Sequence, residues 1–170
     1  MDVPAPTPLK HAFPPIAPPD ARVLILGSLP GDESIARAQY YAHPSNAFWW
    51  LLGEVLALPL ATLPYEARVA ALHDSRIALW DVIASAERPG SLDGAIRSAV
   101  ARDLAGLAAG LPDLRAIAFN GGTAARHGRR QLVGLDSPHV LLDLPSSSAA
   151  YAGVSREAKR DRWLALRDFL

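Results

Sequence analysis

The 170-residue sequence contains no cysteine, which excludes disulfides, thiolate zinc sites and iron–sulfur clusters. It also has no apolar run near the roughly 18 residues that a membrane span requires. Residues 1–21 are broken by prolines and lack an apolar core, so they do not resemble a signal peptide. We therefore expect a cytoplasmic protein that makes no contact with a membrane.

Groups suited to metal or amine catalysis are scarce as well. The histidines are scattered and form no metal-binding motif; they stand at positions 11, 43, 73, 127 and 139. Lys10 and Lys159 are the only lysines, and both lie in terminal segments, where neither is well placed as a Schiff-base nucleophile. The G-x-S-x-G motif of serine hydrolases is also missing. No metal or other cofactor is predicted.

Neither sign of charge is in excess, since 17 basic residues balance 17 acidic ones. A strongly basic nucleic-acid-binding domain would show a surplus of lysine and arginine, so the overall charge argues mildly against one. Arg126, His127, Arg129 and Arg130 nevertheless form a local basic cluster. A second cluster in residues 156–162 is interspersed with acids and is typical of a solvated helix face.

Four short apolar runs are present, at residues 22–28, 76–82, 114–120 and 140–146. Runs of this length suit strands that are buried on both faces of a parallel sheet. Helical stretches are predicted at residues 33–39, 45–58, 65–75, 90–111, 122–132 and 155–170. The alternation predicts an α/β fold, a three-layer α/β/α sandwich with a central, mostly parallel four-stranded sheet.

Seven of the fifteen prolines fall within residues 1–19, which therefore cannot form a helix or an inner strand. We expect a proline-rich N-terminal arm over residues 1–20 and a single α/β domain without internal repeats over residues 21–170. The arm either wraps around the domain or leaves it.

In parallel α/β sheets the functional groups gather at the carboxyl ends of the strands. Three of the four predicted strand exits are rich in Gly, Ser or Asn: GSLPGDES (27–34), FNGG (119–122) and LPSSSAA (144–150). The first is either an ordinary strand-to-helix turn or an anion site at a helix start. Asn120 in the second is either a turn former or an amide presented to a polar ring. The serines of the third either cap the last helix or donate to phosphate.

The segment YYAHPSNAFWW, residues 40–50, holds five of the 12 aromatic residues. Residues 43–45 have the features of a helix start, with proline at the first helical position. Asn46 would then lie at the positive end of the helix dipole, beside the aromatic face of Tyr41. Most of residues 48–50 should be core, because three consecutive residues cannot all face one side of a helix.

Taken in order, GSLPGDES, YYAHPSNAFWWLL, ALWDVIASAERPGSLDGAI, FNGG and LPSSS resemble the uracil-DNA glycosylase superfamily. The similarity extends from about residue 22 to the last residue and is greatest to family 6, the DNA-deoxyinosine (hypoxanthine-DNA) glycosylases. The resemblance implies a monomeric, DNA-binding hydrolase of base excision repair. Such an enzyme flips out a deaminated base, foremost hypoxanthine but also uracil or xanthine, and hydrolyses its N-glycosidic bond. Because no amine nucleophile is present, it should be monofunctional and leave an abasic site.

Departures from other branches of the superfamily carry information about the site. Relatives of the mismatch-specific type have G-I-N-P-G after the first strand, and Leu29 stands here in place of the asparagine that positions their attacking water. Their N-P-S-G motif is replaced by residues 144–147, and the aspartate and histidine of the enzymes best known for uracil excision are absent too. This pattern resembles family 6, and the resemblance points to Asn46 and Asn120 as the catalytic residues.

The resemblance and the strand exits together assign the other roles. Tyr41 matches the aromatic position that stacks on the extruded base, and backbone amides after the first strand could stabilise the charge on the departing base. The predicted base-binding residues are Tyr41, Gly27, Ser28, Leu29 and Phe48. The predicted phosphate-binding residues are Ser34, Ser146, Ser147 and Ser148.

Two other classes of protein remain open. Leu29 allows a catalytically weak nucleic-acid-binding module, which duplex affinity without base release would identify. The balanced net charge suits an enzyme that acts on free nucleosides, which activity on inosine but not on DNA would identify.

Overall fold

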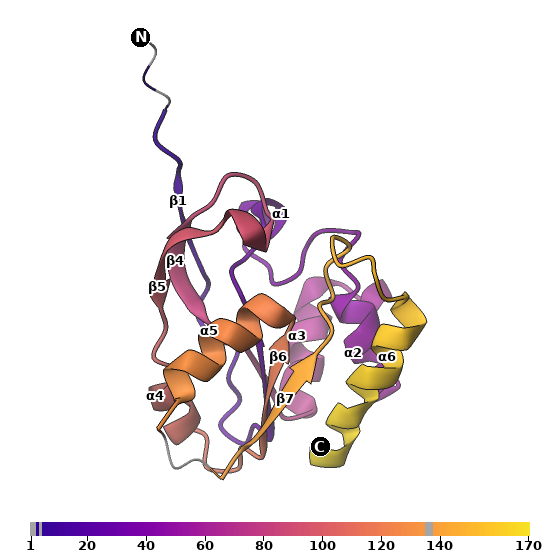
Figure 1. Ribbon diagram of the computed structural model, residues 1–170. Helices are drawn as coiled ribbons and strands as arrows, with labels where there is room; N and C mark the ends of the chain where they lie inside the picture. The colour runs from indigo at the N-terminus through magenta and orange to yellow at the C-terminus, as the bar shows by residue number, and fades with distance from the viewer. Residues whose placement is uncertain (1–2, 4, 135–137) are drawn as a thin grey trace.

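The computed structural model describes residues 3, 5–134 and 138–170 and shows a central sheet between two layers of helices (Figure 1). Four parallel strands form this sheet in the order β3-β2-β6-β7. They are β2 (Val23–Gly27), β3 (Ile77–Asp81), β6 (Ala116–Asn120) and β7 (Val140–Leu144). Each lies within one apolar run of the sequence, and β2, β3 and β6 are buried throughout. The predicted four-stranded parallel sheet is confirmed.

Side chains of the sheet enter two cores, because successive residues of a strand point to opposite faces. Val23 and Ile25 pack on the side of α2 (Phe48–Leu56), α3 (Tyr65–Asp74) and α6 (Arg156–Trp163). Leu24 and Leu26 pack on the side of α4 (Leu104–Ala109) and α5 (Gly122–Leu132). The other helical elements are α1 (Asp32–Arg37) and the 3₁₀ turns Leu60–Thr62, Asp93–Ala95 and Leu164–Phe169. The three-layer sandwich is therefore confirmed.

The prediction of one helix over residues 90–111 was wrong for most of that range. The chain instead forms a hairpin of β4 (Ile83–Glu87) and β5 (Arg97–Ala101), and only the short helix α4 follows. Gly90 turns the chain after β4 with a φ of +68°, which favours glycine. Pairing with β4 then supplies the backbone hydrogen bonds that a helix would have formed. Asp103 sets the later helix start, since its carboxylate accepts from Gly106 N (3.0 Å).

The N-terminal segment lies against this hairpin. β1 (Leu9–His11) pairs antiparallel with β4 and forms one edge of the three-stranded sheet β1-β4-β5. Its residues fall between Pro8 and Pro14, where the chain has the amide hydrogens that an edge strand needs. Further along, Ile16 pairs with Leu79 of β3. Residues 1, 2 and 4 of the predicted arm lie outside the described residues.

Helix α2 begins later than predicted. The expectation that residues 43–45 start it was wrong, because its first residue is Phe48. Residues 43–46 instead form a turn closed by a backbone hydrogen bond of 3.0 Å. Ala47 N then donates to Ser147 O (3.0 Å), which joins this turn to the loop after β7. Within the described ranges, no helix is long and apolar enough to span a bilayer.

Candidate active site

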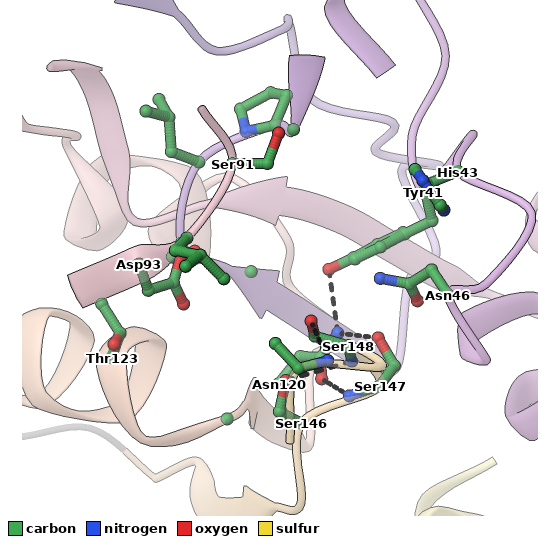
Figure 2. A pocket seen from close by; sticks show the side chains of 18 of the residues that line it. Tyr41, His43, Asn46, Ser91, Asp93, Asn120, Thr123, Ser146, Ser147 and Ser148 are labelled. Carbon is green, nitrogen blue, oxygen red and sulfur yellow. Dashed lines mark hydrogen bonds between the residues drawn. The ribbon is translucent and has the colours of Figure 1, made fainter. Parts of the chain in front are cut away.

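A pocket of about 800 Å³ opens at the carboxyl ends of the parallel strands (Figure 2). Its walls come from the turn after β2, the segment before α2, the loop between β4 and β5, the start of α5 and the loop after β7. The lining residues are Asp81, Arg126 and residues within the ranges 27–34, 40–46, 91–94, 120–123 and 146–151. Segments far apart in the sequence thus meet where a parallel sheet gathers its functional groups.

Tyr41 presents an aromatic face to this pocket (Figure 2). The other face of its ring stacks on Phe48, with the centroids 3.9 Å apart and 13° between the planes. Phe48 is fully buried, so it supports Tyr41 from behind and does not line the pocket. Burial raises the pKa of the Tyr41 hydroxyl, which therefore stays protonated at neutral pH. The pair offers a rigid flat surface with a hydroxyl at its inner end.

Asn120 joins Tyr41 to the loop after β7. Its Nδ2 donates to the Tyr41 hydroxyl (3.1 Å) and to Ser147 Oγ (2.9 Å), and its Oδ1 accepts from Ser147 N (2.9 Å) (Figure 2). Both amide hydrogens are therefore engaged within the protein, and only 9% of the residue is exposed. The structure places Asn120 at the pocket, where its contacts hold two other site groups in position.

Asn46 differs from Asn120 because its amide nitrogen is turned toward the pocket. Its Oδ1 accepts from Phe48 N (3.0 Å), and this hydrogen bond fixes which end of the amide is oxygen. Nδ2 therefore points away from the helix start, toward the space beside Tyr41 (Figure 2). Two N–H donors beside an aromatic face can bind a ring carbonyl or a water molecule.

The turn after β2 forms the inner wall and is held through its carbonyl groups. The oxygens of Gly27 and Ser28 accept from the backbone of residues 82–83, at 2.9 and 3.2 Å. Arg88 is fully buried and donates to the oxygens of the next two residues, Leu29 and Pro30. Because these carbonyls are engaged on the far side, the amide groups of the turn are the polar backbone groups available to an anion in the pocket.

The four serines predicted to contact phosphate divide into two groups. Ser34 and Ser147 are buried; Ser34 Oγ accepts from Ala42 N (3.0 Å), and Ser147 is held by the amide described above. Ser146 and Ser148 are partly exposed, and each hydroxyl accepts from the backbone two residues further on (3.2 Å in both cases). Their hydroxyl hydrogens remain available to an external acceptor such as a phosphate oxygen.

Asp81 is a pocket residue that the sequence reasoning missed. It ends β3 directly beside Gly27 in the sheet register and is only 3% exposed. Burial raises the pKa of its carboxyl to about 7, against the opposing effect of nearby Arg102. Its place at the end of the run RIALWDV was the available signal, because the ends of buried parallel strands carry functional groups.

Neither lysine of the chain lines the pocket. Lys10 donates hydrogen bonds to the Asp32 carboxylate and to Gly90 O, and Lys159 donates to Ser148 O (3.2 Å). In the part of the chain that the structure describes, no three His, Asp or Glu side chains are grouped so that they could hold a metal ion. The pocket therefore offers amide, hydroxyl, carboxyl and aromatic groups for chemistry.

Fold and pocket together define an α/β protein with a pocket at the carboxyl end of its sheet, lined by an aromatic face and by amide and hydroxyl groups. The sequence profile of the uracil DNA glycosylase superfamily matches residues 14–169. The chain belongs to this superfamily, which confirms the resemblance found in its motifs.

Two relatives in this superfamily carry a more specific name, hypoxanthine DNA glycosylase. The one from Methanosarcina acetivorans is 38% identical over 158 residues, which cover 93% of this chain and 98% of the relative. The one from Methanosarcina barkeri is 41% identical over 112 residues, covering 66% of this chain and 71% of the relative. A solution NMR structure of a candidate uracil DNA glycosylase from Methanosarcina acetivorans has a TM-score of 0.83 at 38% identity, covering 95% of this chain and 98% of that one.

Proposed function

We propose that this protein is a monofunctional DNA glycosylase that removes deaminated bases, hypoxanthine foremost. The observation that carries the proposal is the Tyr41 face, backed by Phe48, beside the amide donors of Asn46. Similarity to two proteins named hypoxanthine DNA glycosylase supports the choice of base. Uracil and xanthine are further candidates, because each also presents ring carbonyls to an amide donor.

The target base must leave the duplex before it can enter the pocket. Extrusion costs a few kcal/mol, and less for a poorly paired base. Stacking on the free face of Tyr41 returns roughly 1–3 kcal/mol. Asn46 Nδ2 then donates to a base carbonyl or holds the attacking water, while Asn120 acts by keeping Tyr41 and Ser147 in place. The two asparagines have different roles because Asn120 donates both amide hydrogens within the protein, whereas those of Asn46 face the pocket.

Hydrolysis breaks the bond between C1′ of the sugar and the base nitrogen. The electron pair stays on the base, and water adds to an oxocarbenium-like sugar. The backbone N–H groups of Ser28, Leu29 and Gly31 stabilise the charge that develops on the base; Pro30, between them, has no N–H. Leu29 has a hydrocarbon side chain, so Asn46 is the amide proposed to orient water. Because neither lysine lines the pocket, no Schiff base forms, and the DNA strand stays intact at the abasic site.

Contacts to the flanking phosphates are proposed for the rim of the pocket. Ser146 and Ser148 have hydroxyl hydrogens available there, and Arg126 lines the opening from helix α5. Ser34 and Ser147 are buried, so they support the rim from below. Positively charged and hydroxyl donors at the rim position DNA without reading its sequence.

One chain is proposed to be sufficient for activity, because the segments that line the pocket all lie at one end of a single sheet. We place the protein in the cytoplasm, where its sequence without cysteine meets a reducing environment. Light scattering coupled to gel filtration tests the first statement, and cell fractionation tests the second.

The decisive experiment uses labelled duplexes that contain one hypoxanthine, uracil or xanthine. After incubation with the purified protein, alkali breaks the strand at abasic sites. We expect the fastest cleavage for hypoxanthine and none before alkali is added. Failure to release any of the three bases would overturn the proposal. Duplex affinity without release would then indicate a binding module, and hydrolysis of free inosine alone would indicate a nucleoside hydrolase.

A further inference from the structure

The carboxyl of Asp81 is a buried acid at the inner end of the pocket with no partner of its own. The residue ends β3 in register with Gly27, lines the pocket and is 3% exposed. Its Oδ2 is shielded from solvent and accepts no hydrogen bond from any of the described residues. A buried carboxylate in that condition lacks both water and a compensating donor, so the environment disfavours its charged form.

The charged and titratable groups around Asp81 do not pair with it. Arg102 donates to Phe13 O (2.7 Å) and lies over the ring of Trp80, and Arg88 donates to backbone carbonyls of the turn after β2. Both arginines lower the pKa of Asp81 through space, and the negative charge of Asp93 raises it. Tyr40 and Tyr41 stay protonated and carry no charge. Burial is the largest influence and raises the pKa of Asp81 to about 7. A large fraction of the carboxyl groups therefore holds a proton near neutral pH.

Asp81 also lies close to the hydroxyl of the stacking residue. A Cβ on Gly27 would stand 2.5 Å from the Tyr41 hydroxyl and 2.7 Å from Asp81 Oδ1, so both oxygens border the same small space above this glycine. A ring stacked on Tyr41 has its inner edge at the level of that hydroxyl. The carboxyl is therefore placed at the base and not at the DNA backbone, which passes at the rim.

We propose that Asp81 is the acid that protonates the departing base, a role that rests on the glycosylase activity proposed above. The carboxyl gives its proton to a ring nitrogen as the bond between C1′ and the base breaks and the electron pair moves onto the base. Water then adds to C1′, and the proton it loses returns to the Asp81 carboxylate directly or through solvent. The products are a neutral free base and a sugar with a hydroxyl on C1′, and the acid is restored.

Asp81 is a better proton donor than Asn46 or Tyr41, the other polar groups beside the proposed position of the base. The catalytic amide of Asn46 cannot donate a proton completely, and the Tyr41 hydroxyl is too weak an acid because burial raises its pKa further. Purines have ring nitrogens that accept a proton while the base is still attached to the sugar. Asp81 therefore favours a purine such as hypoxanthine, in agreement with the proposed substrate.

The test is the pH dependence of single-turnover base release from an inosine duplex, for wild type, Asp81→Asn and Asp93→Asn. For wild type we expect a rate that falls about tenfold per pH unit above pH 7, where the acid loses its proton. Asp81→Asn should be slower by about 100-fold at pH 6 and should lose this alkaline limb. Asp93→Asn removes another carboxyl from the pocket lining and should keep the limb, moved to lower pH because the charge of Asp93 helps to raise the pKa of Asp81. Affinity for a duplex with a non-hydrolysable inosine analogue should stay within about twofold for Asp81→Asn, as expected for a residue away from the DNA backbone.

Each outcome bears on a stated claim. A wild-type rate that does not fall between pH 7 and 9, or an alkaline limb that persists in Asp81→Asn, overturns the role of Asp81 and leaves the glycosylase activity standing. No base release by wild type at any pH overturns the activity itself and the role of Asp81 with it. The wild-type profile requires no variant, so the role of Asp81 can be overturned even if Asp81→Asn folds poorly.

Discussion

The ring of Tyr41 lies on the ring of Phe48 at a centroid distance of 3.9 Å, so a residue of the helix core holds the residue that faces the pocket. The aromatic segment of residues 40–50 therefore has a part that lines the pocket, Tyr41, and a buried part that supports it, Phe48. Its buried part fixes the angle of the ring on which a base is proposed to stack. Rigid support of this kind reduces the ordering that binding would otherwise require.

Tyr41→Ala should reduce hypoxanthine release by about 10- to 100-fold, because stacking on an aromatic ring contributes roughly 1–3 kcal/mol per base. Tyr41→Phe is the matched control, since it keeps the ring and removes the hydroxyl that accepts from Asn120. Single-turnover rates and unfolding in urea should show a smaller rate loss for Tyr41→Phe, with a stability cost of about 1 kcal/mol. Equal rates for wild type and Tyr41→Ala would remove the stacking role.

Gly27→Ala should lower activity strongly, because its Cβ would come within 2.7 Å of both the Tyr41 hydroxyl and the Asp81 carboxyl. One of these side chains must then move. Gly31→Ala is the control in the same turn, since the nearest atom to its Cβ is Ser91 Oγ at 3.5 Å, an ordinary contact. Base release should fall at least tenfold further for Gly27→Ala than for Gly31→Ala, an estimate for displacement of a positioned group. Similar rates in the two variants would contradict the tight packing above Gly27.

Asn46 has two functions that substitutions can separate. Asn46→Asp keeps an oxygen for Phe48 N and removes the amide donors, whereas Asn46→Ala removes both. We expect loss of most base release in both variants, and a stability loss of about 1 kcal/mol in Asn46→Ala alone. Glycosylase assays and urea unfolding, run on the same preparations, measure the two effects. A wild-type rate in Asn46→Asp would show that the donors are not needed.

Asp81→Asn should change stability in a manner that depends on pH. The folded-state pKa of Asp81, about 7, is above the usual value for an aspartate, so the folded protein keeps a proton that the unfolded chain loses. The resulting stabilisation is fully present below about pH 4 and is lost as the pH rises to about 7. Relative to wild type, Asp81→Asn should therefore gain about 4 kcal/mol between pH 4 and pH 8, since the folded and unfolded pKa values differ by about three, at about 1.4 kcal/mol per pKa unit. Urea unfolding at several pH values measures this gap, and a gap that does not change with pH would contradict the raised pKa.

Much of the fold followed from local pattern. The four parallel strands and helix α5 were predicted closely because an apolar run with a polar exit, or a regular helical period, is visible in adjacent residues. The hairpin of β4 and β5 was missed because the backbone of β5 pairs with another segment, β4, and the sequence of β5 alone does not show that pairing. Its alanine-rich sequence favours a helix locally, and the open edge of β4 overrides that preference.

The sequence by itself determined that polar groups would meet at one end of a parallel sheet, and it identified Tyr41, Asn46 and Asn120 as residues of that end. Only the tertiary structure decided which of these groups are hydrogen-bonded within the protein. The side-chain amide of Asn120 donates both hydrogens to Tyr41 and Ser147, which are 79 and 27 positions away in the sequence. Asn46 uses its amide oxygen for Phe48 N, and its amide hydrogens face the pocket. Asp81 becomes an unpaired buried acid through the elements that cover it. Hydrogen-bond partners and desolvation depend on which distant segments pack together, and no local pattern specifies them.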